Sequence, residues 1–128
     1  MRIKLLSVLV YDQDKALKFY TEILGFVKKT DIPMGEHRWL TVVSAEEQDG
    51  PEIVLEPMGF TPSQVFQKAL FDAGIPWTAF QVDDVRKEVE RLSALGVSFS
   101  MQPTQMGTAM LAVFNDTCGN NIQLFQVL

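Results

Sequence analysis

The chain has 128 residues, of which 47% are hydrophobic and 21% charged, and its formal net charge is −5. This composition is typical of a globular domain with its own core, while the acidic balance and the short runs of basic residues argue against a nucleic-acid partner. With the single cysteine, Cys118, and no run of apolar residues long enough to span a membrane, we expect a cytoplasmic protein without a membrane partner.

The first half of the chain begins with alternating residues that predict a strand over residues 3–10. Asp12 then offers a helix N-cap, and an apolar stripe over residues 12–26 predicts a helix that ends at Gly25. Two more strands, joined by the polar hairpin loop "AEEQDGP", are expected near residues 38–44 and 52–56.

A helix is predicted between the two halves of the chain, in the segment "TPSQVFQKALFDAGIP". Pro62 suits the first turn of a helix, and Gly74 and Pro76 are typical of its end. We therefore expect residues 58–76 to form a helical connection.

The second half repeats the order of the first. "WTAFQVDD" resembles "LLSVLVYD" 72 residues earlier, Asp84 offers the N-cap of a second helix, and Gly96 matches Gly25. Met34-Gly35 recurs as Met106-Gly107, and "NIQLFQ" echoes "EIVLEP". This duplication predicts an α+β fold of two β-α-β-β-β modules, residues 1–57 and 77–128.

The tandem repeat, together with "KALKFYTEILGF" and "GNNIQLFQ", resembles the vicinal oxygen chelate superfamily. That group includes glyoxalase I, bleomycin-resistance proteins, fosfomycin-resistance proteins and extradiol dioxygenases. The resemblance covers almost the whole chain and implies one domain over residues 1–128, in which the modules form a cup of curved mixed sheets. It also implies a homodimer.

In metal-dependent members of that group, the resemblance implies a His at the start of each module and a Glu in its last strand. Those positions fall here on Leu5 and Val54 in the first module, and on Trp77 and Gln123 in the second. Three of these side chains offer no ligand atom and the fourth is a neutral amide, so we expect no metal and no cofactor. A pair of His37 and Glu56 would supply too few ligands to replace the site.

Strand alternation and neighbouring polar groups suggest which side chains line the cup. The residues expected there are Leu5, Ser7, Leu9, His37, Arg38, Trp39, Val54, Glu56, Trp77, Ala79, Gln123 and Phe125. One interpretation is an apolar pocket with an aromatic wall for a small organic ligand. The other is that the apolar members fill the space as core, while Arg38 and Trp39 are packing residues and His37 and Glu56 are exposed. Catalytic residues are not identified.

The leading hypothesis for function is a metal-independent protein of the glyoxalase/bleomycin-resistance type that binds a small organic molecule. A second hypothesis is a lyase, isomerase or dioxygenase-related enzyme that uses unusual residues such as His37, Arg38 and Glu56. A third is a non-catalytic interaction protein in which the cup is filled.

Overall fold

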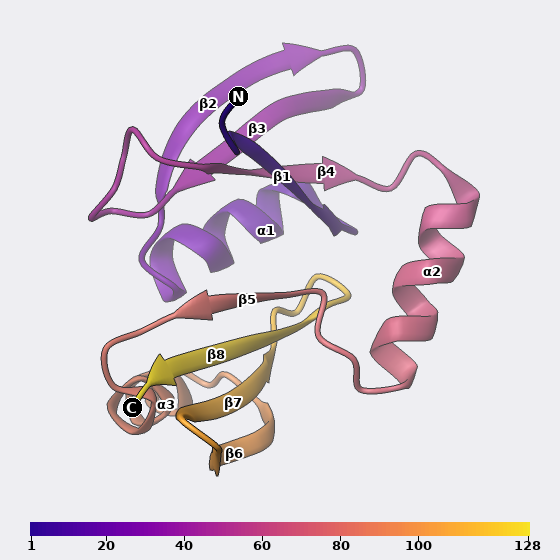
Figure 1. Ribbon diagram of the computed structural model, residues 1–128. Helices are drawn as coiled ribbons and strands as arrows, with labels where there is room; N and C mark the ends of the chain where they lie inside the picture. Colours follow the sequence, from indigo (N-terminus) through magenta and orange to yellow (C-terminus); the bar gives the residue numbers. More distant parts are fainter. The chain divides into compact units, whose positions relative to one another are not determined.

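Each half of the chain folds into a strand, a helix and three further strands (Figure 1). The computed structural model describes residues 1–128 and divides into two compact units, Met1–Gln64 and Val65–Leu128. The elements of the first unit are β1 Leu5–Val10, α1 Gln13–Lys18, η1 Phe19–Ile23, β2 Val27–Met34, β3 His37–Val43 and β4 Glu52–Pro57. The second unit contains β5 Thr78–Gln81, α3 Val85–Ala94, β6 Phe99–Met106, β7 Ala109–Asn115 and β8 Asn121–Val127. Helix α2, Thr61–Asp72, carries the chain from one unit into the next.

The two sheets have the same topology, which confirms the predicted α+β fold of duplicated modules. Their strand orders are β1-β4-β3-β2 and β5-β8-β7-β6. In each sheet the first strand runs parallel to the last strand of its module, and the other neighbours are antiparallel. Both sheets are therefore mixed, and the two halves of the chain have the same strand order.

Both module helices begin as the sequence predicts. The side chain of Asp12 accepts a hydrogen bond from Lys15 N at 3.1 Å, and Asp84 accepts one from Lys87 N at 3.1 Å. Each carboxylate satisfies one of the amides that a helix leaves without a partner at its first turn. Gly25 follows the first helix with a φ of +88°, which requires a residue that tolerates the left-handed region.

The first helix differs from the predicted single α-helix over residues 12–26. After Lys18 the backbone widens into the π-helix η1, in which Leu24 N donates to Phe19 O at 3.0 Å. This wider turn places Phe19 and Tyr20 together in the core, with ring centroids 5.8 Å apart. Apolar periodicity does not distinguish the two helix types, because a π segment only inserts one residue into the pattern.

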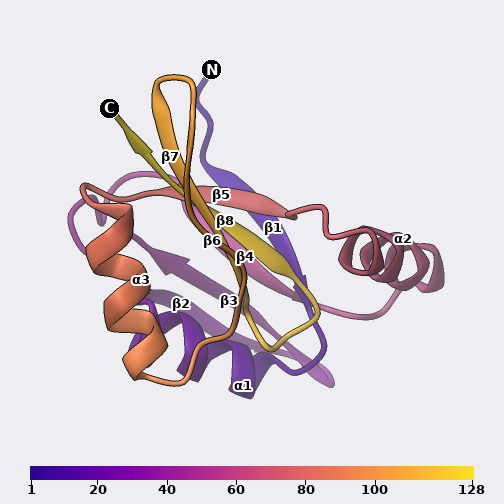
Figure 2. The ribbon, with the colours of Figure 1, turned by 90° about the horizontal axis from the view of Figure 1, so that it is seen from below.

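The core of each unit lies between its sheet and its module helix. Helix α1 packs against β3 and β4 (Figure 1), and it covers Leu40 and Leu55, which are fully buried. In the second unit α3 packs against β6, β7 and β8 (Figure 2), where Phe114 and Ile122 are fully buried. One face of each sheet thus packs against its module helix.

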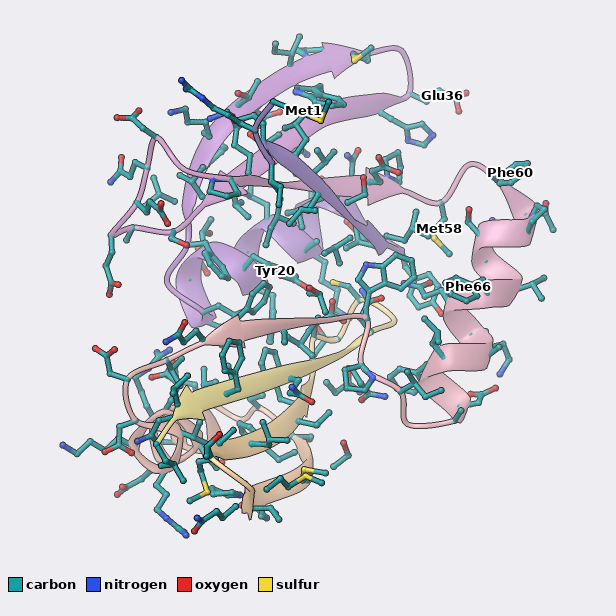
Figure 3. All side chains as sticks on the ribbon, in the orientation of Figure 1. Met1, Tyr20, Glu36, Met58, Phe60 and Phe66 are labelled. Atoms are coloured by element: carbon teal, nitrogen blue, oxygen red, sulfur yellow. The ribbon has the colours of Figure 1, made fainter.

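Helix α2 is joined to the second unit through side chains on its later turns. Gln67 Nε2 donates to Asn120 Oδ1 at 3.0 Å, and the ring of Phe66 meets that of Trp77 edge to face at 5.9 Å. Figure 3 shows Phe60 at the start of α2 and Phe66 farther along it. No helix of the chain combines the length and the apolar character that a membrane span requires.

Candidate functional site

In the first sheet, the face opposite α1 gathers most of the predicted site residues of this unit. β1 and β4 are parallel neighbours, with Ser7 beside Val54 and Leu9 beside Glu56. Leu5 shares this face by alternation, because side chains two residues apart on a strand point the same way. We call this surface the Ser7 face; its β1 and β4 members are Leu5, Ser7, Leu9, Glu52, Val54 and Glu56.

The polar centre of the Ser7 face is a hydrogen bond between two strands. Ser7 Oγ donates to Glu56 Oε1 at 2.7 Å. Glu56 is half-buried, while Leu9 beside it is 9% exposed and Val54 is 3% exposed. A half-buried carboxylate with a hydroxyl partner therefore lies beside hydrocarbon side chains.

Two residues of the same face were missed by the sequence interpretation. Thr41 Oγ1 donates to Glu52 Oε1 at 2.8 Å, and Lys4 Nζ lies 3.4 Å from Glu52 Oε2. Thr41 and Glu52 are both buried, so this contact compensates the burial of the Glu52 carboxylate. Alternation gave a signal for Glu52, since it lies two residues before Val54 on the same strand.

β3 separates its three predicted site residues between the two faces of the sheet. His37 and Trp39 alternate with Thr41 and share its face, whereas Arg38 points toward α1. The guanidinium of Arg38 pairs with Asp14 at the start of α1 and with Asp31 on β2, where Nε lies 3.0 Å from Oδ1. Arg38 and Trp39 therefore lie on opposite faces of the sheet, and their joint place in the cup stays a prediction.

These ion pairs shift the ionisation of their members. Hydrogen bonding from Arg38 lowers the pKa of the Asp31 carboxyl below its ordinary value of 3.8. Hydrogen bonds to Asp31 and Asp14 raise the pKa of the Arg38 guanidinium. Arg38 is thus a permanent cation held between α1 and β2, where it joins the helix to the sheet.

Gln13 fills a gap in the first sheet where β3 and β4 separate. Its Nε2 donates to Arg38 O at 2.7 Å and to Leu55 O at 2.9 Å, and its Oε1 accepts from Arg38 N at 3.0 Å. The backbone pairing between the two strands ends at Thr41 and Val54. The side-chain amide of Gln13 therefore supplies hydrogen bonds where the backbone pairing of β3 and β4 is missing, and it keeps β4 in position beside α1.

The second sheet presents a comparable face opposite α3. Ala79 pairs with Gln123 and Gln81 pairs with Phe125, so these side chains share one face. Trp77 stands directly before β5 and donates its backbone N–H to Asn121 O at 2.8 Å. Ala79 is exposed, whereas Trp77, Gln123 and Phe125 are half-buried.

The residues at the four expected ligand positions do not fit a divalent metal ion. Leu5 and Val54 in the first unit are hydrocarbon, and the indole of Trp77 offers no lone pair to a cation. Gln123 contributes one neutral amide oxygen, which cannot replace imidazole and carboxylate ligands. The chain also brings no group of three or more His, Cys, Asp or Glu side chains together in a metal-binding arrangement.

Comparison with known proteins gives a consistent family. The sequence model described as Glyoxalase/Bleomycin resistance protein/Dioxygenase superfamily matches residues 2–124. The chain is 52% identical to uncharacterized protein YurT of Bacillus subtilis, over 98% of this chain and 99% of that protein. It is 30% identical to a probable lactoylglutathione lyase of Synechocystis, over 91% of this chain and 88% of that protein.

Two solved structures extend this likeness to the whole fold. UcmS2 is 33% identical with a TM-score of 0.84, and the match covers 98% of this chain and 97% of UcmS2. TnmS3, an antibiotic binding protein from Streptomyces sp. CB03234, is 30% identical with a TM-score of 0.77. This match covers 100% of the present chain and 97% of TnmS3.

Proposed function

Because the chain belongs to the glyoxalase/bleomycin resistance protein/dioxygenase superfamily, we propose that it binds a small organic molecule without the help of a divalent metal ion. The observation that carries the proposal is the chemistry at the expected ligand positions: hydrocarbon at Leu5 and Val54, indole at Trp77 and a neutral amide at Gln123. Such a set favours an apolar or aromatic ligand that is oriented by a few polar groups.

The polar groups available in the first unit support this proposal. Ser7 and Glu56 form a hydrogen-bonded pair on the Ser7 face, next to the apolar side chains of Leu5 and Leu9. In the second unit, Trp77 and Phe125 contribute aromatic surface and Gln123 contributes an amide. TnmS3, which has the same fold, is an antibiotic binding protein, and this supports small-molecule binding.

The proposal is tested with a neutral aromatic probe, N-acetyl-1-pyrenemethylamine, whose binding is followed by fluorescence anisotropy. We expect saturable binding that Leu5→Gln weakens about fivefold, because an amide replaces half-exposed hydrocarbon at the proposed contact. Leu6→Gln is the matched control: Leu5 and Leu6 are 48% and 53% exposed, but they point to opposite faces of β1. No saturable binding, or equal losses in both variants, would count against the proposal.

Catalysis of the lyase type is a second candidate, since a relative is named a probable lactoylglutathione lyase. In that case the carboxylate of Glu56 is the group available to accept a proton, with Ser7 as its hydrogen-bond partner. Turnover of the hemithioacetal of methylglyoxal and glutathione, by protein free of metal, distinguishes this activity from binding alone. We expect no turnover.

The compartment and assembly that accompany this function are also proposals. A single cysteine, buried as Cys118, suits a reducing cytoplasm. The superfamily resemblance favours a homodimer, and light scattering coupled to size exclusion should give twice the chain mass of 14.4 kDa. A mass equal to one chain at all concentrations would contradict the dimer.

A further inference from the structure

Among the carboxylates of this chain that are not exposed, Glu56 differs from the others in its hydrogen-bond partner. Of the 16 aspartate and glutamate residues, five are not exposed at the surface: Glu52, Glu56, Asp84, Glu88 and Asp116. Four of them meet a basic side chain or backbone amides. The pairs are Glu52 with Lys4, Asp84 with Lys87, Glu88 with Arg91, and Asp116 with the amides of Cys118 and Asn120. Glu56 is the exception, because its partner is the hydroxyl of Ser7.

This exception leaves the half-buried Glu56 carboxylate without a cationic partner in the chain. An ionised carboxylate accepts about four hydrogen bonds, and its transfer from water into apolar surroundings is costly unless a cation or donors replace the water. Ser7 supplies one donor to Oε1, whereas Oε2 accepts none from the chain. Leu9, the β1 neighbour of Glu56, is nearly buried and offers no polar atom in its side chain.

Two basic side chains that approach the first sheet are already engaged elsewhere. Lys4 binds Glu52 and also donates to Gly50 O at 3.1 Å. Arg38 lies on the opposite face, between Asp14 and Asp31. The countercharge that Glu56 lacks is therefore not supplied by these side chains.

We infer that the small molecule bound at the Ser7 face carries a protonated amine, and that Glu56 binds this ammonium group; the inference rests on the function proposed above. A primary ammonium has three N–H donors, which suits the two carboxylate oxygens of Glu56. Ser7 acts as a positioning residue, because its hydrogen bond fixes the orientation of the carboxylate.

A monovalent ammonium fits this site better than a divalent metal ion. One carboxylate and one hydroxyl provide too few ligands for calcium or magnesium, which take six or more oxygen ligands. The apolar neighbours Leu5 and Leu9 suit the carbon skeleton of an organic cation instead. The expected ligand class is thus an amine attached to an aromatic or aliphatic body.

The test compares two probes that share the pyrene ring but differ in charge: 1-pyrenemethylamine, which is protonated at pH 7, and its neutral N-acetyl derivative. Fluorescence anisotropy should show that the wild-type protein binds the amine at least tenfold more tightly than the acetyl derivative. Glu56→Gln, which is nearly isosteric and can still accept the Ser7 hydrogen bond, should abolish this preference, because it weakens binding of the amine about tenfold or more. Glu46→Gln, in an exposed loop of the same unit, removes the same charge and should keep the preference.

The outcomes separate this inference from the function on which it rests. Equal affinities of the wild type for both probes, or a preference that persists in Glu56→Gln, would overturn the role of Glu56 and leave small-molecule binding intact. Loss of the preference in Glu46→Gln as well would assign it to net charge and also overturn the inference. If neither probe binds the wild type, both proposals fail.

Discussion

Glu52 and Glu56 lie four residues apart on β4 and share a face, yet their surroundings give them different roles. Glu52 is buried and is compensated by Thr41 and Lys4, so it contributes to the structure of the sheet. Glu56 is half-buried and has only the hydroxyl of Ser7. The sequence presents the two as equivalent carboxylates; the neighbouring residues in the fold determine which one has a cationic partner.

Part of the Ser7 face could be predicted from the sequence, because strand alternation fixes which side chains share a face. Leu5, Ser7 and Leu9 follow directly from that rule. The contacts of Arg38 could not be predicted, since they depend on Asp14 and Asp31, which come from a helix and from another strand. The bonds of Gln13 to β3 and β4 were unpredictable for the same reason.

Gln13→Ala should lower the free energy of unfolding by about 2–4 kcal/mol, because it leaves three backbone polar groups of β3 and β4 without their partner. Urea denaturation followed by circular dichroism measures the change. Gln48→Ala is the control: this exposed glutamine has one long hydrogen bond, to Ala45 O at 3.3 Å, and its loss should change stability by less than about 0.5 kcal/mol. Equal losses of unfolding free energy in the two variants would show that Gln13 does not replace the missing backbone hydrogen bonds between β3 and β4.

The ion pair between Asp31 and Arg38 predicts a pH dependence of stability. Since the folded state lowers the pKa of Asp31, the stabilisation is fully present above the ordinary value of 3.8 and is lost as the pH falls through the lower, folded value. Asp31→Asn should therefore be less stable than the wild type at pH 7, and the difference should shrink between about pH 5 and pH 2. Urea midpoints across this range measure it.

A matched variant tests whether this pH effect belongs to the Arg38 pair. Asp49 is a fully exposed carboxylate of the same unit, 3.5 Å from Lys29 Nζ. Asp49→Asn should change the midpoint little at either pH, because exposed ion pairs contribute little to stability. A difference between Asp31→Asn and the wild type that stays constant down to pH 2 would contradict the assignment.

At the scale of elements, the first and last strands of each module and the helix starts were predictable, whereas the edge strands β2 and β6 were not. β2 and β6 form the outer edges of their sheets, and they contain Pro33 and Pro103 together with register irregularities. Edge strands tolerate proline and polar residues because one side of the backbone has no neighbouring strand. The alternation by which β1 and β4 were located is consequently weak in these strands.

The two N-caps provide a prediction for the helices. Asp12→Ala and Asp84→Ala should each lower the free energy of unfolding by about 1 kcal/mol, because each removes the acceptor for an amide of the first helical turn. The double variant should lose about the sum, since the two sites lie in different units. Urea denaturation of the three variants checks this. Unchanged stability in either single variant would show that its helix does not depend on the cap.

At the scale of the whole chain, the two modules share one backbone topology, but their sheet faces differ in chemistry. The Ser7 face in the first unit carries a carboxylate and a hydroxyl, whereas the face around Gln123 in the second unit carries aromatic side chains and an amide. Repetition in the sequence predicted the common backbone, because the caps and glycines that shape it recur at nearly equal spacing. It could not predict the partners of individual side chains, since those differ between the modules.

The central claim, that binding requires no divalent metal, is tested most directly by the affinity for N-acetyl-1-pyrenemethylamine before and after removal of metal ions. Protein treated with EDTA and dialysed, with metal content verified by elemental analysis, should bind the probe with an unchanged Kd. Added zinc, nickel, iron or manganese should not alter that Kd. Loss of binding after chelation, restored by a stoichiometric amount of one of these metals, would contradict the account.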